Sequence, residues 1–289
     1  MKKWIKGLLT GMVLAAVLTG CGSGVPDGAE NITEKSAEEY VQAAHEMLEA
    51  ADSFSATFMG TVQMKDSGGT GIDGTVEMVK EPLYMNVDAV LTFDELVQEY
   101  DLYLEETEDS VNQYMSYDGE WTELTLDESS ALTGTQIYNT LYNMEAILTA
   151  VEEWTVEETD GDILLSGSIP EEKFYDVESY TRWFQLAGMS GLSEVYYNGV
   201  GDVHVEVLLD SKGVPFGYAV ELAGALETLT NNVLTELGGG KLENPVEVEM
   251  YMIASELTQL DGVEAGEVPA EAKKDAINYE KEISMLENE

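Results

Sequence analysis

The single cysteine of this chain, Cys21, is its first candidate for chemistry and lies in the stretch LTGCGSG (residues 18–24). A thiol can act as a redox group, a metal ligand, a nucleophile or an attachment point for lipid. A disulfide within the chain needs a second cysteine, and a zinc site needs further cysteine or histidine ligands. The chain has no second cysteine, and His45 and His204 lie far from residue 21 in the sequence. These facts argue against a redox or metal role for this thiol.

Other patterns that could support catalysis are incomplete. Residues 188–192 (GMSGL) come close to a nucleophile elbow but lack the second glycine at the required position. Residues 238–241 (GGGK) are followed by Leu242 rather than Ser or Thr, so we interpret them as the end of a helix and a turn. His204 is expected on the polar side of a strand, where a histidine-based triad has no local support. We therefore expect no catalytic residues and no enzymatic activity.

Two acidic, glycine-containing stretches could be considered for calcium. Residues 66–74 (DSGGTGIDG) contain two aspartates but lack the ligand number and the closing glutamate of an EF-hand loop. Residues 160–162 (DGD) are similar and shorter. We interpret both as hairpin turns in an acidic protein, and we expect no metal site and no cofactor.

Residues 1–20 have the organisation of a secretory signal peptide. Three lysines within the first six residues precede a mainly apolar segment at 7–17, which is too short to span a bilayer unaided. The segment ends on the small residues Thr19 and Gly20. We therefore expect the protein to be exported.

The residues before the cysteine, Leu18, Thr19 and Gly20, resemble together with Cys21 the lipobox of bacterial lipoproteins. This resemblance implies that diacylglycerol is attached to the Cys21 thiol and that the chain is cleaved before it. Acyl chains on one residue suffice for stable anchoring. The alternative is an ordinary secretion signal with an incidental cysteine. The resemblance implies a protein anchored to the extracytoplasmic face of the bacterial cell membrane.

The charge of the chain excludes some partners. The sequence has 13 basic and 57 acidic residues, and cleavage after residue 20 leaves 10 basic residues and a net charge of −47. Phosphate backbones and anionic headgroups repel such a chain, so we expect no binding to nucleic acid. With 44% hydrophobic residues, the remainder of the chain can still form a core.

The order of segments suggests one domain. After the signal peptide at 1–20, residues 21–35 form a lipidated N-terminus and a small, polar tether. A single domain is expected over 36–275, and an acidic C-terminal tail over 276–289. A capping box at residues 36–39 opens a helix that continues to about residue 51.

Alternating apolar and polar residues predict a large antiparallel sheet with one buried face. Further helices are expected near 137–154, 177–188 and 226–237. We predict an α+β fold in which a strongly curved sheet, a half-barrel, wraps over helices. The apolar members of the alternating runs are Phe54, Ala56, Phe58, Val62 and Met64; Leu83, Met85, Val87, Ala89 and Leu91; Val203, Val205, Val207 and Leu209; Phe216, Tyr218, Val220 and Leu222; and Val246, Val248, Met250 and Met252.

A hairpin motif strengthens this interpretation. Residues 114–121 (YMSYDGEW) place Asp118-Gly119 at a tight turn. With the early helix, the long strands, residues 205–215 (VEVLLDSKGVP) and residues 267–271 (EVPAE), the chain resembles poorly characterised Gram-positive surface lipoproteins with a LolA/LppX-like fold. The resemblance covers about residues 36–275. It implies a half-barrel sheet that encloses an apolar cavity. The best-known proteins with this fold carry lipids or lipoprotein acyl chains.

Aromatic and methionine side chains are the candidates for lining such a cavity. We select Tyr180, Trp183 and Phe184, from one segment, with Met85 and Met250 from the alternating runs. Soft methionine side chains suit an adaptable apolar site. The alternative is that all five belong to an ordinary core or to cross-strand pairs.

The leading hypothesis is a non-enzymatic lipoprotein that binds or carries a lipophilic small molecule between sheet and helices. The first alternative is a structural or interaction lipoprotein whose acidic surface recruits a basic envelope protein or cations. An envelope hydrolase is a third class, and it would need a cleft that holds His204 or two close carboxylates.

Overall fold

A computed structural model describes residues 35–159, 161–240 and 242–278. The chain divides into a short unit that ends at Ser36 and a large unit that begins at Ala37. The predicted lipidation site, with Leu18, Thr19, Gly20 and Cys21, lies outside the described residues.

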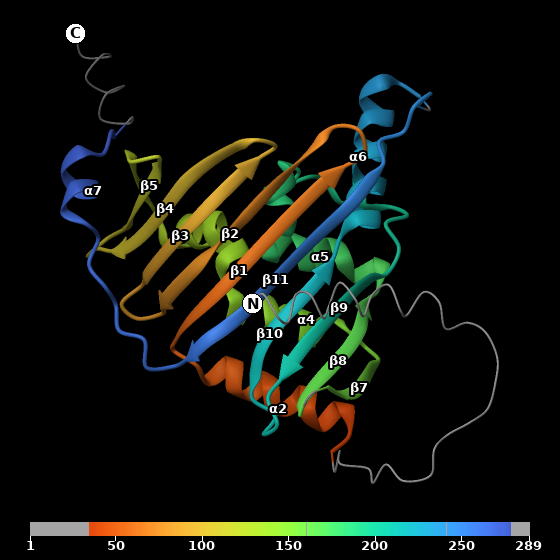
Figure 1. Cartoon of the computed structure of the whole chain (residues 1–289), viewed down its shortest axis with the longest axis horizontal. Coiled ribbons are helices and arrows are strands. Elements are labelled where there is room, and N and C mark those ends of the chain that lie inside the picture. The colour runs from red at the N-terminus through yellow and green to blue at the C-terminus, as the bar shows by residue number, and fades with distance from the viewer. Residues whose placement is uncertain (1–34, 160, 241, 279–289) are drawn as a thin grey trace. The chain divides into compact units, whose positions relative to one another are not determined.

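The large unit is built on one antiparallel sheet, which has eleven strands in the described residues (Figure 1). Their order is β6-β5-β4-β3-β2-β1-β11-β10-β9-β8-β7, so the first and last strands of the chain pair in the middle. The strands are β1 (Ser53–Met64), β2 (Gly68–Val79), β3 (Tyr84–Phe93), β4 (Leu96–Glu106), β5 (Val111–Tyr117), β6 (Glu120–Leu126), β7 (Trp154–Thr159), β8 (Asp162–Ile169), β9 (Val203–Leu209), β10 (Pro215–Glu221) and β11 (Val248–Leu260).

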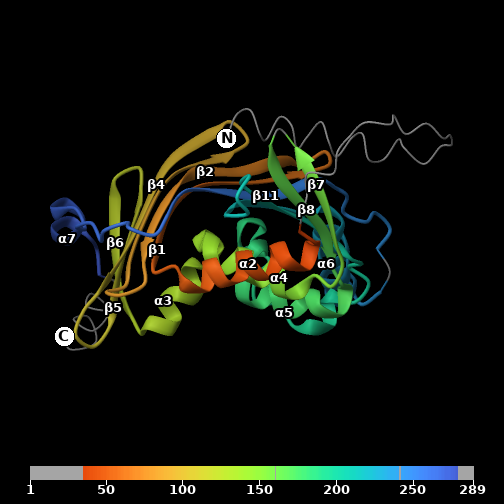
Figure 2. The ribbon, with the colours of Figure 1, turned by 90° about the horizontal axis from the view of Figure 1, so that it is seen from below.

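Helices cover one face of this curved sheet. Figure 2 shows the sheet as an arch, with α2 to α6 on its hollow side. The helix α7 lies on the other side, where it packs against β5 and β6. The helical segments are α2 (Ala37–Ala50), α3 (Glu128–Thr135), η1 (Gln136–Tyr138), α4 (Thr140–Ala150), α5 (Glu171–Thr181), η2 (Trp183–Ala187), η3 (Glu194–Tyr197), α6 (Ala223–Gly238) and α7 (Ala270–Asp275).

This arrangement confirms the predicted α+β fold with a curved antiparallel sheet over helices. The predicted first helix corresponds to α2, and the helix expected near residue 137 corresponds to η1 followed by α4. The predicted turn at Asp118-Gly119 is also confirmed. Both residues have positive φ angles, 52° and 85°, as the primed turns of two-residue hairpins require.

The alternation in β1 produces the core because its inward side chains face the helices. Phe54, Ala56, Phe58 and Val62 are buried in one cluster with residues of α2, α4 and η2. The missing member of this row is Gly60, where a Cβ atom would lie 2.7 Å from the Leu186 side chain of η2. Glycine at this position therefore allows η2 to approach the sheet closely.

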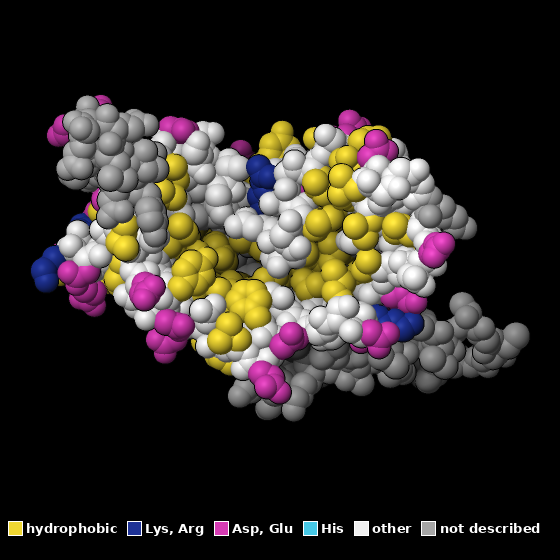
Figure 3. Space-filling view, turned by 90° about the horizontal axis from the view of Figure 1, so that it is seen from above, with side chains coloured by type: hydrophobic (Ala, Val, Ile, Leu, Met, Phe, Trp, Pro, Cys, Tyr) yellow, Lys and Arg dark blue, Asp and Glu magenta, His cyan; other side chains and the backbone are white. Residues whose placement is uncertain are grey.

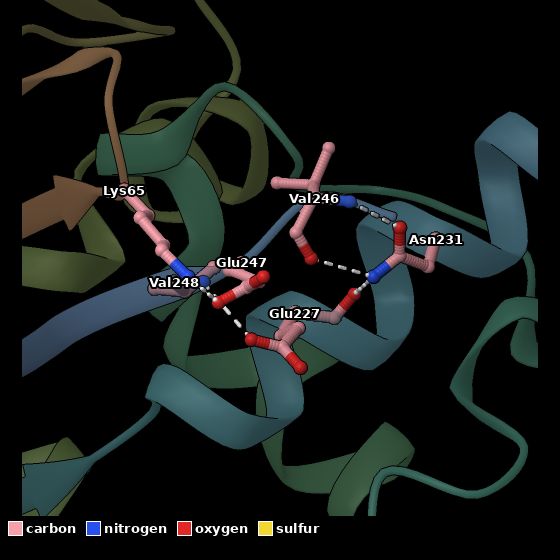
Figure 4. A network of polar contacts seen from close by, with 6 residues as sticks. All are labelled: Lys65, Glu227, Asn231, Val246, Glu247 and Val248. Atoms are coloured by element: carbon pink, nitrogen blue, oxygen red, sulfur yellow. Dashed lines mark hydrogen bonds and ion pairs between the residues drawn. The ribbon is translucent and has the colours of Figure 1, made fainter. Parts of the chain in front are cut away.

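Polar contacts fix α6 to the segment that leads into β11. The Asn231 side chain donates to the Val246 carbonyl oxygen and accepts from the Val246 amide, at 2.9 and 2.8 Å (Figure 4). One turn earlier, the Glu227 carboxylate accepts from the Val248 amide at 3.0 Å. These side chains satisfy backbone groups just before the strand, and so determine where β11 begins.

Candidate ligand-binding groove

An open groove of about 410 Å³ lies between strands β2 to β5 and the helical segments α3, η1 and η2. Figure 3 looks onto the end of the molecule that carries the β3–β4 turn, and it shows hydrophobic side chains gathered around a hollow. The lining residues are Thr70, Ile72, Leu91, Phe93, Tyr100, Leu102, Gln113, Met115, Tyr117, Gly134, Ile137, Tyr138, Gln185, Leu186 and Gly188.

The strand register builds the floor of the groove. Ile72 pairs with Leu91 across β2 and β3, and Leu102 pairs with Met115 across β4 and β5. Directly opposed side chains in an antiparallel sheet point to the same face. Because successive side chains of a strand point to opposite faces, these apolar side chains of four neighbouring strands lie in rows under the helices.

The opposite wall comes from the helical segments. Ile137 and Tyr138 of η1 and Leu186 of η2 face the sheet across the groove. The Gln185 side chain donates to the Gly134 carbonyl oxygen at 3.3 Å, which joins η2 to the end of α3. The wall is thus continuous from α3 to η2.

Three tyrosines that line the groove lie close together. The ring centroid of Tyr100 lies 5.2 Å from that of Tyr117 and 6.4 Å from that of Tyr138. Burial raises the pKa of Tyr138 to about 12, and burial together with Tyr138 raises the pKa of Tyr100 well above its usual value. The phenols of Tyr100 and Tyr138 therefore stay protonated and uncharged at any physiological pH.

None of the fifteen lining residues is charged, although 24% of the whole chain is charged. Four larger hollows, of about 530 to 610 Å³, also lie on the described surface, and one of them shares Thr70 and Ile72 with the groove. Each of the four is lined by at least two charged side chains. Among these five hollows of the described residues, the smaller groove is therefore the one in which an apolar ligand would meet no ionised group. We take it as the candidate binding site.

Comparison with solved structures gives several distant similarities, among them two mycobacterial lipoproteins. The lipoprotein LppX of Mycobacterium tuberculosis is 14% identical, with a TM-score of 0.40, over 80% of this chain and 100% of its own. LprF of Mycobacterium bovis is 12% identical, with a TM-score of 0.44, over 81% of this chain and 96% of its own. No protein family matches the sequence, and no curated protein does. The function has to be inferred from this chain's own residues.

Three of the five residues selected from the sequence as cavity lining lie in the packed core. Trp183, Phe184 and Met85 have no exposed surface. The ring centroid of Phe184 lies 5.8 Å from that of Phe174 and 5.9 Å from that of Tyr251. These side chains support the groove from behind, while the next residues of η2, Gln185 and Leu186, line it.

The other two selected residues lie away from the groove. Tyr180 is 61% exposed on α5, beside a separate hollow between α4 and α5. Met250 pairs with Gln63, whereas Met64 pairs with Val248, so β11 has one extra residue here. This bulge reverses the alternation, and Tyr251 and Ile253 then face the helices in place of Met250.

The sequence contained a signal for the floor of the groove that our selection did not use. The alternating run from Leu83 to Leu91 can be extended by one step to Phe93, and the side chains of Leu91 and Phe93 both line the groove. The residues of β4 and β5 that join them, Leu102 and Met115, alternate in the same way. What the sequence did not reveal is which end of each run lies beside the helices and which end stays open.

Neither histidine lies at the groove. His204 Nε2 lies 3.6 Å from the Glu206 carboxylate on β9, and His45 Nε2 lies 3.4 Å from the Thr149 hydroxyl of α4. Within the described ranges, no three His, Cys, Asp or Glu side chains come together as metal ligands would. The helices of these ranges include none with the length and apolarity needed to cross a bilayer.

One carboxylate is buried behind the groove wall. Glu178 of α5 is 1% exposed, and it accepts hydrogen bonds from the Tyr197 hydroxyl at 2.6 Å and the Phe184 amide at 3.3 Å. Burial raises the pKa of Glu178 from its usual value of 4.5, while the two hydrogen bonds and Arg182 act in the opposite direction. The folded protein therefore holds the Glu178 proton more tightly than the unfolded chain does.

This difference predicts a pH dependence of stability. A raised pKa in the folded state means that the contribution of Glu178 is complete below pH 4.5 and declines as the pH rises through the folded-state pKa. Glu178→Gln mimics the protonated acid and removes this decline. The melting temperature of the variant relative to the parent is therefore expected to increase from pH 4.5 to pH 8. Thermal unfolding across this range tests it, with the exposed Glu172→Gln on the same helix as control. A difference in melting temperature between the Glu178→Gln variant and the parent that did not change with pH would contradict the raised pKa of Glu178.

Proposed function

We propose that this chain is a membrane-anchored extracytoplasmic lipoprotein, without enzymatic activity, that binds or carries a lipophilic ligand in the groove. The observation that carries the proposal is the uncharged lining of the groove on a chain with a net charge of −44. Burial of apolar ligand surface against such a lining is favourable, and no ionised group of the protein has to lose its water.

The lining also limits the chemistry of the ligand. A volume of about 410 Å³ lies within the range of small-molecule sites, so a compact ligand or one hydrocarbon chain fits. The polar groups available are neutral, from tyrosine, threonine and glutamine side chains. No lysine or arginine lines the groove to pair with an anion. An ionised headgroup would therefore stay in solvent at the open side.

Native mass spectrometry of the full protein purified from cells tests the binding function. We expect a non-covalent mass, lost on delipidation and restored by an uncharged apolar compound. Identical spectra before and after delipidation, with no binding of an apolar dye, would rule out the carrier function. Salt-sensitive capture of a basic envelope protein in that case would favour the alternative of an acidic recruitment surface.

The anchor is tested separately at Cys21. Cys21→Ser removes the thiol to which diacylglycerol would be attached, so the variant is expected to leave the detergent phase in a two-phase extraction. Ser23→Ala, two residues away, is the control and should stay in the detergent phase. Unchanged partition of the Cys21→Ser variant would show that the thiol carries no anchor.

A further inference from the structure

The turn between β3 and β4 carries an exposed apolar tip, which we define as Val90, Phe93, Leu96 and Val97. Phe93 is 42% exposed, Leu96 56% and Val97 61%. Large apolar side chains cost free energy when they are left in water, and a contiguous group of them marks an interaction site. The tip lies at the end of the molecule viewed in Figure 3.

The tip is held in a defined shape. The Asp94 carboxylate accepts the Gly69 amide at 2.9 Å, and the Asp94 amide donates to the Gly69 carbonyl oxygen at 3.0 Å. These bonds tie the turn to β2 and direct the Asp94 carboxylate back onto the backbone. The apolar side chains are therefore presented by a fastened turn.

Both faces of the tip carry exposed apolar side chains. Phe93 pairs with Leu96 on the groove side of the sheet, and Val97 pairs with Thr92 on the opposite side. The wet face of an antiparallel sheet normally carries polar residues, but here Val90 and Val97 lie on it beside Thr92 and Glu99. A flat protein partner would cover one face of this wedge, whereas a lipid surface can surround both.

The tip is continuous with the groove. Leu91 and Phe93 line the groove, and Phe93 belongs to the tip as well. Tyr117, the neighbour of Tyr100, is also exposed at this end and lines the groove. Tyrosines are favoured where apolar and aqueous phases meet. An apolar molecule that left a bilayer beside Phe93 would therefore pass directly to the uncharged lining of the groove.

The charges of the tip indicate which lipid surface it suits. Between residues 90 and 97 the ionisable residues are Asp94 and Glu95, and no lysine or arginine is present. Attraction to anionic headgroups is therefore absent, and contact has to come from apolar burial. Such contact is expected on uncharged or zwitterionic headgroups, and it should depend little on salt.

We propose that the β3–β4 tip inserts into the surface of a lipid bilayer and connects the groove with it. This inference rests on the proposed function, because a carrier has to exchange its ligand with a membrane. The occupant of the exposed tip is thus a zwitterionic lipid surface, which contacts Phe93, Leu96 and Val97 on both sides of the hairpin.

A fluorescent reporter on the tip tests this directly. Leu96→Cys in the full protein, labelled with an environment-sensitive dye, is added to phosphatidylcholine vesicles with and without a bromine-labelled quencher in the acyl chains. We expect a blue shift and strong quenching. The control is Lys212→Cys in the β9–β10 turn at the other end of the sheet, which should show neither. The unsubstituted protein is labelled in parallel, because a free Cys21 thiol would react, and both variants are then repeated with Cys21→Ser.

A second variant measures the contribution of the side chains. Replacing Leu96 and Val97 together by asparagine is expected to weaken vesicle binding of the Cys21→Ser protein by about tenfold or more, because two apolar side chains are no longer buried. Both side chains are exposed, so melting temperature and dye binding to the groove in the absence of vesicles should be unchanged.

The outcomes separate this inference from the proposed function. Equal signals from positions 96 and 212 on vesicles would overturn the insertion of the tip, even if the groove binds an apolar dye. A blue shift at position 96 that rises with protein concentration without vesicles would also overturn it, in favour of contact with a second copy. If the tip inserts into vesicles but the groove binds no apolar dye, the inference about the tip would be supported and the proposed carrier function would be rejected.

Discussion

Replacing Leu91 with glutamate is expected to lower the affinity for an apolar ligand by about a hundredfold. Leu91 lies in the floor of the groove, where none of the lining residues is charged. When the ligand binds, a carboxylate at this position would either lose its hydration shell or keep water molecules that occupy part of the ligand site. Either effect would weaken the binding free energy by roughly 3 kcal/mol. Since Leu91 is only half-buried without ligand, the fold should tolerate the change. Titration with an environment-sensitive apolar dye measures the affinity.

The neighbouring residue supplies a matched control for this experiment. Thr92 is half-buried to a similar degree but points to the other face of β3, so Thr92→Glu adds the same charge outside the groove. Its affinity for the dye should stay within about twofold of the parent, an effect below 0.5 kcal/mol. If both variants bind as well as the parent, the groove is not the site. If both lose binding and stability together, the effect is on the fold.

Trp183→Ala is expected to destabilise the protein by about 3–5 kcal/mol, the range for removal of a large aromatic side chain from a core. Trp183 has no exposed surface, and its carbonyl oxygen accepts a hydrogen bond from Tyr251. For a domain of this size, such a loss lowers the melting temperature by roughly 8–15 °C. Calorimetry measures this, and the exposed Tyr180→Ala, three residues earlier, should change stability by no more than about 0.5 kcal/mol.

The two substitutions also decide between two interpretations of the same segment. From the sequence, Tyr180 and Trp183 were both candidates for cavity lining. In the structure the first lies on the surface and the second in the core. A variant of Trp183 that kept its melting temperature but lost ligand binding would contradict the core assignment and restore the original interpretation.

The sequence predicted the sheet well because alternation is a local property. Phe54 to Met64 alternate over one strand, and β1 forms there. The eight residues around Asp118-Gly119 predicted a hairpin, because only a few turn types join two strands through two residues. Both features depend on neighbouring residues alone.

Two features could not be predicted in the same way: the glycine-rich strand β2, and which side chains of β11 face the helices. Residues 66–74 were interpreted as a hairpin turn. Asp66 and Ser67 do lie in the turn, but residues 68–74 belong to β2, where Gly68 to Gly74 pair with β1. Glycine has low strand propensity, so tertiary pairing determined this strand. Likewise, the bulge before Met250 depends on the partner strand β1 and not on the sequence of β11 alone.

The groove residues were missed for a different reason. Periodicity identifies an inward face, yet it does not say where helices cover that face fully and where they leave it open. Leu102 is buried and Phe93 is exposed, although both belong to inward rows. The difference comes from the positions of η1 and η2, which are set by contacts distant in sequence, such as Leu186 against Gly60.

The central pairing of β1 with β11 has a consequence for the order in which the chain is synthesised. The Asp52 amide donates to the side chain of Asp261, 209 residues later in the sequence. β1 follows Asp52 and β11 ends just before Asp261, and the pairing of these two strands joins the halves of the sheet. Strands β2 to β5, which carry the groove floor, leave the ribosome long before β11 does. Until β11 arrives, β1 has one bare edge and the two half-sheets have no common strand. The sheet therefore stays incomplete until almost all of the chain has been made. This order would suit the export that we propose, because an exported chain is threaded through a membrane before it folds.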